Sequence, residues 1–316
     1  MEETIYWAHL AAIEGLGGAT FDELLKRFGS LKRALEAPLH EVREIPSMDE
    51  RTAEAICRAH MTLDATRAQI EELMNRGIRV ITKLDSLYPP RLREAPDPPP
   101  LIYLAGDLLR PDDRAVAIIG SRDCSEISAR RSRQYARYLA QEGLTVVSGY
   151  APGVDLSAHL GALEAGGRTI IIPGCGADYF DFSPLSTLDI TSFSDLAKQA
   201  VWISEQPPGA DWSGKSATAR NRLVAAQARA VLVMEARLQS STLDTVARAK
   251  KLDRPIFVQT FATISEKVLG NEMLRKEGAG LVQSVEDLQP IVDLVLGEGR
   301  AGGKKSPPAG GDDLRR

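Results

Sequence analysis

Small, hydroxyl-bearing and cationic residues follow the short apolar runs of this sequence. Gly120, Ser121 and Arg122 come directly after the run at 116–119. Glycine lets a ligand approach the backbone, serine can donate its hydroxyl, and arginine offers a fork of N–H donors that suits a phosphate. A helix is expected from Glu126, and the free N–H groups at a helix start favour an anion. The segment therefore predicts a phosphate contact, with a tight turn and a surface arginine as the alternative.

The next apolar run ends in a second loop of this kind. Ser148 and Gly149 close the run, and Gly153 follows in the same loop. Asp155 is expected in the first turn of the next helix, where a negative charge is favourable. His159 lies one turn beyond Asp155, so a hydrogen bond between the two side chains is possible. We expect this bond to brace the start of the helix; a catalytic pair with the same spacing is the alternative.

The third and fourth loops add glycines and cations. Gly174 ends the third run, and Gly176 follows it. Downstream of the fourth run, Arg220, Asn221 and Arg222 precede an apolar helical stretch. Two arginines at positions i and i+2 cannot face the same way on a helix. We therefore expect a junction between loop and helix at this point, which would let both arginines reach one site.

The fifth loop contributes hydroxyl groups. Glu235 ends the fifth run, and Ser240 and Ser241 begin the helix after it, where hydroxyl and N–H groups again suit a phosphate. A plain N-cap is the alternative for these two serines. Lys215 lies in the polar segment before Arg220 and would add a further cation. Together the five loops predict a mildly cationic pocket that is lined for phosphate.

No residue pattern predicts a cofactor or a metal. The three cysteines, Cys57, Cys124 and Cys175, lie far apart and lack a metal-binding or disulfide spacing, so we expect them to be reduced. The dinucleotide fingerprint G-x-G-x-x-G is missing after the first apolar run. Its absence argues against an NAD-dependent dehydrogenase.

The loops can meet only if the apolar runs form one sheet. The runs are short and bounded by turn residues, as in strands that are buried on both faces, and stretches with helical spacing separate most of them. They lie at 116–119, 144–149, 168–174, 200–205, 230–235 and 255–259. Strands and helices that alternate at these lengths predict an α/β fold, with a mostly parallel sheet and helices on both faces. Ligands of such sheets bind beyond the carboxyl ends of the strands.

Composition divides the chain into four segments. Residues 1–75 carry short helical patterns joined by glycine turns, which predict a small all-α domain like SAM or helix-hairpin-helix modules. Its turns could offer N–H groups to phosphates, or it could serve for packing or for contact with another protein. Residues 76–112 include a proline cluster, and we expect an extended connector that adds strands to the sheet. Residues 113–296 hold the main α/β domain. Residues 297–316 are rich in glycine and charge, and we expect them to be disordered.

Overall composition is that of a soluble globular protein. Of the 316 residues, 43% are hydrophobic and 26% are charged, and the net charge is −4. A generic nucleic-acid binder is usually basic overall, so contact with a polyanion must come from a local patch. No apolar run is long enough to span a membrane, and the amino terminus lacks the pattern of a signal peptide. We therefore expect a cytoplasmic protein without a membrane partner.

In order and spacing, these segments resemble the DNA-processing protein A family, also called DprA or Smf. The matching stretches include Gly120-Ser121-Arg122, Gly153-Val154-Asp155 and Arg220-Asn221-Arg222. The resemblance implies an extended Rossmann-like domain that binds single-stranded DNA without cutting it. It also implies transfer of that strand to a RecA-type recombinase during uptake of foreign DNA, and a homodimer formed through the Rossmann-like domain. By this likeness, the residues that hold the DNA backbone would be Gly120, Ser121, Arg122, Gly149, Gly153, Arg220 and Arg222.

The sequence departs from the family pattern at several places. Ser241 stands where the family usually has a glycine, and Val258-Gln259-Thr260 replaces a Pro-Gly pair. Residues 181–198 are unlike the usual loop, which contains Tyr-Pro. The resemblance does not reach a C-terminal winged-helix domain, which many members carry. We therefore expect a divergent member without that domain.

The resemblance thus implies a single-stranded DNA-binding recombination mediator of natural transformation rather than an enzyme, with no cofactor. One alternative is a nucleotide-binding sensor with the same superfamily shape. Another is an enzyme like the nucleotide phosphoribohydrolases, which carry a Pro-Gly-Gly-x-Gly-Thr run. The corresponding run here, Pro173-Gly174-Cys175-Gly176, lacks the second adjacent glycine and the threonine.

Overall fold

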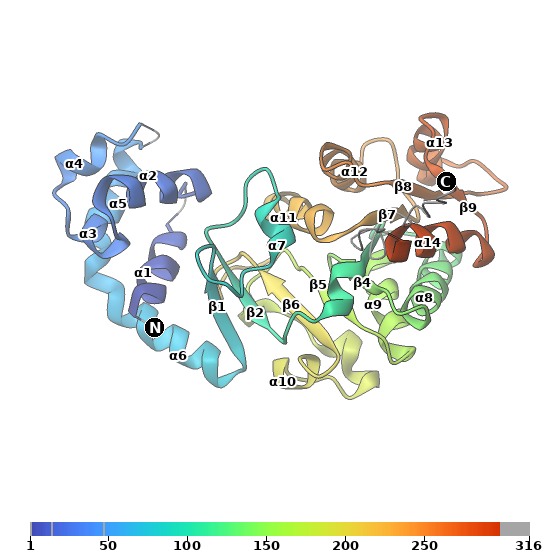
Figure 1. Ribbon diagram of the computed structural model, residues 1–316, viewed down its shortest axis with the longest axis horizontal. Coiled ribbons are helices and arrows are strands. Elements are labelled where there is room, and N and C mark those ends of the chain that lie inside the picture. Colours follow the sequence, from blue (N-terminus) through green and yellow to red (C-terminus); the bar gives the residue numbers. More distant parts are fainter. Residues whose placement is uncertain (1, 14, 47, 298–316) are drawn as a thin grey trace, which may run out of the picture.

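One sheet organises the part of the chain that the computed structural model describes, which comprises residues 2–13, 15–46 and 48–297 (Figure 1). Within these residues the sheet has nine strands in the order β1-β2-β6-β5-β4-β3-β7-β8-β9. The strands are β1 (Ile78–Thr82), β2 (Leu101–Ala105), β3 (Ala115–Ile119), β4 (Thr145–Ser148), β5 (Thr169–Ile171), β6 (Ala200–Ser204), β7 (Ala230–Val233), β8 (Ile256–Gln259) and β9 (Gly280–Val282).

The strands from β6 across to β9 run parallel, whereas β1 and β2 join one edge in antiparallel pairs. The α/β fold with a mostly parallel sheet, predicted from the alternating apolar runs, is confirmed. β3 lies in the middle, and its Val116 is paired with Val146 of β4 on one side and Ala230 of β7 on the other. The chain leaves β3 toward one side and later returns to the other. Such a reversal opens a crevice at the carboxyl ends of the central strands.

Helices cover both faces of this sheet. Val116 and Ile118 of β3 pack under α8, α9 and α14, whereas Ala117 and Ile119 pack under α7, α11, α12 and α13. Because α9, α11 and α12 each follow a parallel strand, their amino ends lie at the carboxyl edge of the sheet. The helices are α7 (Pro90–Arg93), α8 (Glu126–Gln141), α9 (Val154–Glu164), α10 (Phe193–Leu196), α11 (Gly214–Gln227), α12 (Ser241–Lys251), α13 (Leu269–Lys276) and α14 (Gln289–Gly297).

Short helices form the amino-terminal region, as predicted. The turn between α2 and α3 shows how the sequence sets their ends. Gly29 adopts a left-handed φ of 77° and donates its N–H to the Leu25 carbonyl at 2.8 Å, which ends α2. Ser30 then accepts from the Arg33 N–H and starts α3. The helices are α1 (Glu2–Ala11), α2 (Gly18–Phe28), α3 (Leu31–Glu36), α4 (Leu39–Arg43), α5 (Glu50–Ala59) and α6 (Leu63–Asn75).

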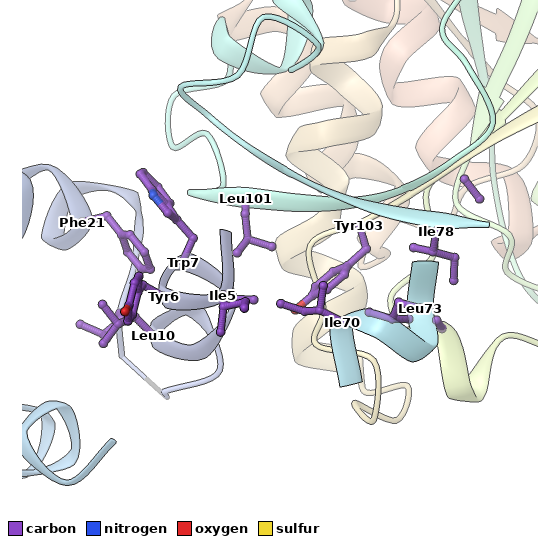
Figure 2. Close-up of a cluster of buried hydrophobic side chains, with 14 of the residues drawn as sticks. Ile5, Tyr6, Trp7, Leu10, Phe21, Ile70, Leu73, Ile78, Leu101 and Tyr103 are labelled. Carbon is purple, nitrogen blue, oxygen red and sulfur yellow. The ribbon is translucent and has the colours of Figure 1, made fainter. Parts of the chain in front are cut away.

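This helical region shares a hydrophobic core with the antiparallel edge of the sheet (Figure 2). Trp7 of α1 stacks on Phe21 of α2, with ring centroids 5.1 Å apart. Figure 2 shows Ile70 of α6 beside the ring of Tyr103 on β2. The helices therefore rest directly on β1 and β2, the strands of the expected connector. The segment boundaries drawn from composition stay predictions.

The apolar runs do not predict the last elements, β9, α13 and α14. β9 has three residues and only one of them is buried, so it leaves no periodic signal. Residues 298–316, most of the segment expected to be disordered, lie outside the described residues. No helix among the described residues is long and apolar enough to cross a membrane. Short 3-10 turns occupy η1 (His60–Thr62), η2 (Arg110–Arg114), η3 (Ala177–Tyr179), η4 (Ser183–Leu188), η5 (Glu266–Val268) and η6 (Glu286–Leu288).

Candidate functional site

A cavity of about 410 Å³ lies at the carboxyl edge of the sheet, where the segments that follow β3, β4, β6 and β7 meet. We refer to it as the polar cavity. The structure brings together there eight of the residues that sequence patterns single out, although they come from four separate loops and helices. These residues are Gly120, Ser121, Arg122, Asp155, Arg220, Asn221, Ser240 and Ser241.

Arg220 forms part of the cavity wall, although it is almost fully buried. Its exposed fraction is 6%, and its guanidinium packs directly over Gly149, where an added Cβ would lie 1.5 Å from Nη1. Its Nε has no hydrogen-bond partner among the described residues. Asp155 is buried nearby; burial raises the pKa of this carboxyl group, and the Arg220 charge opposes the rise. A buried cation with an unused donor suits an anionic ligand.

The amino end of α12 forms another part of the wall. Ser240 occupies the N-cap position, but its hydroxyl donates to the Arg237 carbonyl at 3.0 Å instead of accepting from the helix. The first N–H groups of α12 therefore have no side-chain cap from Ser240, and they carry the positive end of the helix dipole. Thr242 and Thr245 add hydroxyl groups to the lining. A phosphate placed here would meet N–H donors, hydroxyls and the Arg220 guanidinium together.

The charges of the polar cavity do not cancel. Three arginines and two aspartates line it. Arg237 pairs with Asp123 at 3.0 Å, and Arg220 faces Asp155. Arg122 is exposed, and its guanidinium lies 4.3 Å from the ring centroid of Trp212. The excess positive charge of the cavity therefore comes from Arg122.

The junction between loop and helix expected before Arg220 is wrong. α11 begins at Gly214, because Ser213 and Ser216 form a reciprocal capping box at its start. Arg220 and Arg222 therefore both lie inside the helix. Two residues correspond to about 200° around a helix axis, so the two side chains diverge.

Arg222 consequently lies outside the polar cavity and has a structural contact of its own. Its Nη1 and Nη2 donate to the two carboxylate oxygens of Glu205 at 2.7 and 2.6 Å, and its Nε donates to the Asp97 carbonyl at 2.7 Å. Arg222 and Lys215 border a different hollow, which separates the amino-terminal helices from α11. Neither residue lines the polar cavity, to which the sequence patterns assign them.

The predicted hydrogen bond between Asp155 and His159 is also wrong. Asp155 is buried instead near Arg220, where burial raises the pKa of its carboxyl group and the Arg220 charge, the Ser148 hydroxyl and the backbone N–H groups of Ala151 and Gly149 oppose the rise. His159 is fully buried, and its Nδ1 lies 2.7 Å from the hydroxyl of Thr169 on β5. The helix spacing allows the expected bond, but a strand residue offers His159 a partner that the spacing cannot reveal.

Acid should destabilise the fold in part through His159. The Thr169 hydroxyl donates to the Val146 carbonyl at 2.9 Å, so the ring proton of His159 resides on Nδ1. Nε2 is buried and has no partner among the described residues, and burial lowers the pKa of His159 from 6.5 to about 3. Between these values only the unfolded chain binds the extra proton. The stability present above pH 6.5 is therefore lost as the pH falls toward 3, by up to about 1.4 kcal/mol per pH unit.

Urea unfolding between pH 7 and pH 4 measures this slope, and His159→Gln provides the control. Glutamine does not titrate, so the free energy of unfolding of the variant should fall less steeply with acid. Comparison of slopes removes any constant loss of stability that the substitution causes. Equal slopes for the two proteins would assign the acid sensitivity to other groups.

Known protein sequences match this chain over most of the fold described above. A family model described as DNA recombination-mediator protein A matches residues 79–292, which include almost the whole sheet and every residue that lines the polar cavity. The chain belongs to this family. The Smf protein of Synechocystis sp. is 30% identical over 290 residues, which cover 90% of this chain and 72% of that protein. The DNA processing protein DprA of Streptococcus pneumoniae is 35% identical over 205 residues, or 65% of this chain and 71% of that protein.

Solved structures of DprA proteins share the fold. The X-ray structure of DprA from Streptococcus pneumoniae superposes with a TM-score of 0.73 at 28% identity and covers 92% of this chain and 97% of its own. The DprA structure from Helicobacter pylori, described for its single-stranded DNA binding mode, superposes with a TM-score of 0.57 at 28% identity. That match covers 70% of this chain and 96% of the Helicobacter chain.

Other predicted residues support the loops of this DprA family member without lining the polar cavity. Ser148 donates its hydroxyl to a carbonyl of β3 at 2.6 Å. Gly153 precedes α9 with a φ of 83°, which a residue with a side chain rarely adopts. Glu235 is 1% exposed and accepts hydrogen bonds from Ser125 and Ser128 at 2.6–3.2 Å, which ties β7 to the start of α8. These residues hold the backbone that forms the cavity.

A second hollow of about 380 Å³ adjoins the polar cavity, and we call it the apolar cavity. Arg122 and Ala151 line both hollows. Gly149 and Gly174 line the apolar cavity, whereas Gly176 lines neither hollow and donates its N–H to the Ala210 carbonyl, in the loop before α11, at 2.8 Å. The loop glycines predicted from sequence are therefore divided between the two hollows and their supports.

The polar cavity also contains residues that the sequence patterns do not single out. Thr218 lines the polar cavity, and Gly214 and Asn221 line it four residues before and three residues after Thr218. Residues three and four positions apart share one face of a helix, so a helix that begins at Gly214 places these three residues together. Arg237 lies in the loop after β7, and nothing in its local sequence marks it.

Proposed function

We propose that this protein is a single-stranded DNA-binding recombination mediator, and that it holds the sugar-phosphate backbone in the polar cavity. The observation that carries the proposal is the buried Arg220, whose Nε has no partner among the described residues, beside the start of α12. A phosphate would satisfy both groups. The family description, recombination mediator, and the single-stranded DNA named for the Helicobacter relative support the same ligand.

We further infer that the bound strand is passed to a RecA-type recombinase during natural transformation, in the cytoplasm and by a homodimer. The family description supports the mediator role. We also propose that the protein acts without catalysis or a cofactor. In support, the carboxylate of Glu235 is engaged by Ser125 and Ser128, and the carboxyl group of Asp155 is buried beside the Arg220 charge.

Fluorescence anisotropy with a labelled oligonucleotide tests the proposal. Binding should favour the single strand over a duplex of the same length and weaken with salt, because bound phosphates release counterions. RecA-dependent strand exchange in the presence of a single-strand-binding protein should start faster when this protein is added. Equal affinity for duplex and single strand would contradict the proposed ligand, and an unchanged lag would contradict the mediator role.

Arg122→Ala should weaken oligonucleotide binding by about tenfold and leave the melting temperature unchanged. Arg122 supplies the excess positive charge and is exposed, so its removal costs a phosphate contact and little packing. The slope of log affinity against log salt should become shallower by about 0.7, as for one lost contact to a single strand. Lys251→Ala at the far end of α12 removes an equal charge and should change neither quantity.

A free nucleotide is the second candidate ligand, because the volume of the polar cavity lies in the range of small-molecule sites. A nucleotide-binding sensor should bind a purine monophosphate at low micromolar concentration and lose oligonucleotide binding in competition. A phosphoribohydrolase-like enzyme should release free base from it. Absence of both effects at millimolar nucleotide would leave the polynucleotide as the ligand.

A further inference from the structure

Trp212 is exposed in a protein that buries its other tryptophans. Its exposed fraction is 46%, whereas Trp7 and Trp202 are 1% and 0% exposed. Exposure of a large apolar ring is unfavourable and is common where a ligand later covers the ring. Trp212 borders the apolar cavity, and its contact with Arg122 places it at the boundary with the polar cavity.

The backbone on both sides of Trp212 is fixed. Ala210 accepts a hydrogen bond from the Gly176 N–H at 2.8 Å, two residues before the ring. Ser213, the next residue, caps α11 together with Ser216, and Ser216 donates to the Gly174 carbonyl at 2.6 Å. Trp212 is therefore presented from a segment that is anchored to the loop after β5 by two hydrogen bonds. An exposed ring on an anchored backbone loses little further entropy when it binds a ligand.

The surroundings of the ring suit a flat aromatic ligand attached to a phosphate. The apolar cavity is lined by Pro152, Pro184 and the half-exposed Tyr179 as well as by Trp212. Arg122 lines both hollows, so they are adjacent. One ligand could therefore place one group in the apolar cavity and the group bonded to it in the polar cavity. In a nucleotide, the base and the phosphate are joined in this manner.

We propose that Trp212 is the stacking residue for one unpaired nucleobase, whose adjoining phosphate lies in the polar cavity. The inference rests on the proposed function, since it specifies how that site selects a single strand. Stacking requires a free base face, and in a duplex each face is covered by the neighbouring base pair. Trp212 thereby contributes strand selectivity, whereas the phosphate contacts of the polar cavity contribute affinity for either form.

Intrinsic fluorescence tests the inference without a label. The chain has three tryptophans and two are buried, so a change on oligonucleotide binding reports Trp212. Titration with a deoxythymidine oligonucleotide should quench the emission in step with the anisotropy change. An oligonucleotide of the same length with abasic sites should bind more weakly by about tenfold and should not quench.

Variants separate stacking from charge. Trp212→Leu keeps an apolar side chain but removes the aromatic face, and it should lower single-strand affinity by about tenfold while leaving duplex affinity and the salt slope unchanged. Trp212→Phe should restore most of the single-strand affinity. Oligonucleotide binding with unquenched emission, or equal affinities for Trp212→Leu and the wild type, would overturn the stacking role and leave the proposed function intact. No oligonucleotide binding by the wild type would overturn both.

Discussion

Replacement of Arg222 by alanine should lower the free energy of unfolding by about 3 kcal/mol, because it breaks a buried ion pair and leaves the partner charge behind. The side chains of Arg222 and Glu205 are 10% and 13% exposed, and two hydrogen bonds of 2.6 and 2.7 Å join them. The loss of the Arg222 Nε–H also frees the Asp97 carbonyl. For a chain of 316 residues the melting temperature should fall by roughly 5 °C.

Glu205→Gln and the double variant Arg222→Ala/Glu205→Ala are the controls, with unfolding followed by circular dichroism. The double variant should be more stable than Arg222→Ala alone, because it carries no unpaired carboxylate. Oligonucleotide affinity of the folded Arg222→Ala protein should stay near that of the wild type. A normal melting temperature combined with lost affinity would place Arg222 on the DNA instead, as the family likeness implies.

Arg220 and Arg222 have different surroundings in the fold, although the sequence places them in one motif. Both arginines belong to one motif, and an anion site that uses both requires a loop at that point. A single hydroxyl pair, Ser213 with Ser216, starts the helix earlier and sends the two side chains to different surroundings. The Ser213 and Ser216 pair is visible in the sequence, but serine is also common in loops, so the pair alone does not locate the start of the helix. Because both arginines lie inside α11, helix geometry directs their side chains to different surroundings.

The position of the site could be predicted better than its contacts. Parallel strands place all their carboxyl ends at one edge, so the loops after β3, β4, β6 and β7 must be neighbours whatever their individual conformations. This is why residues as distant as Ser121 and Ser240 meet in one cavity. Partners such as Thr169 for His159, or Asp123 for Arg237, depend on side-chain packing across elements. No periodicity in the sequence encodes such pairs.

Gly149→Ala should reduce oligonucleotide affinity by roughly 10- to 100-fold, because the new methyl group and the Arg220 guanidinium cannot share one position. The added Cβ would lie 1.5 Å from Nη1 and 2.3 Å from Cζ of Arg220. Gly149 has no positive φ, so the backbone itself accepts alanine and the strain falls on the Arg220 side chain. A charged group displaced from the cavity wall loses its charge-assisted hydrogen bonds to phosphate, each worth about 1.5–3 kcal/mol.

A double-variant cycle with Arg220→Ala tests this displacement directly. If Gly149→Ala acts through Arg220, the double variant should bind oligonucleotide no more weakly than Arg220→Ala alone, because the same contact cannot be lost twice. The double variant should also be at least as stable as Gly149→Ala, since the shortened side chain removes the overlap. Additive losses of affinity would instead indicate that the Gly149 backbone touches the DNA independently. Either pattern distinguishes a glycine that makes room for a cation from a glycine that makes room for a ligand.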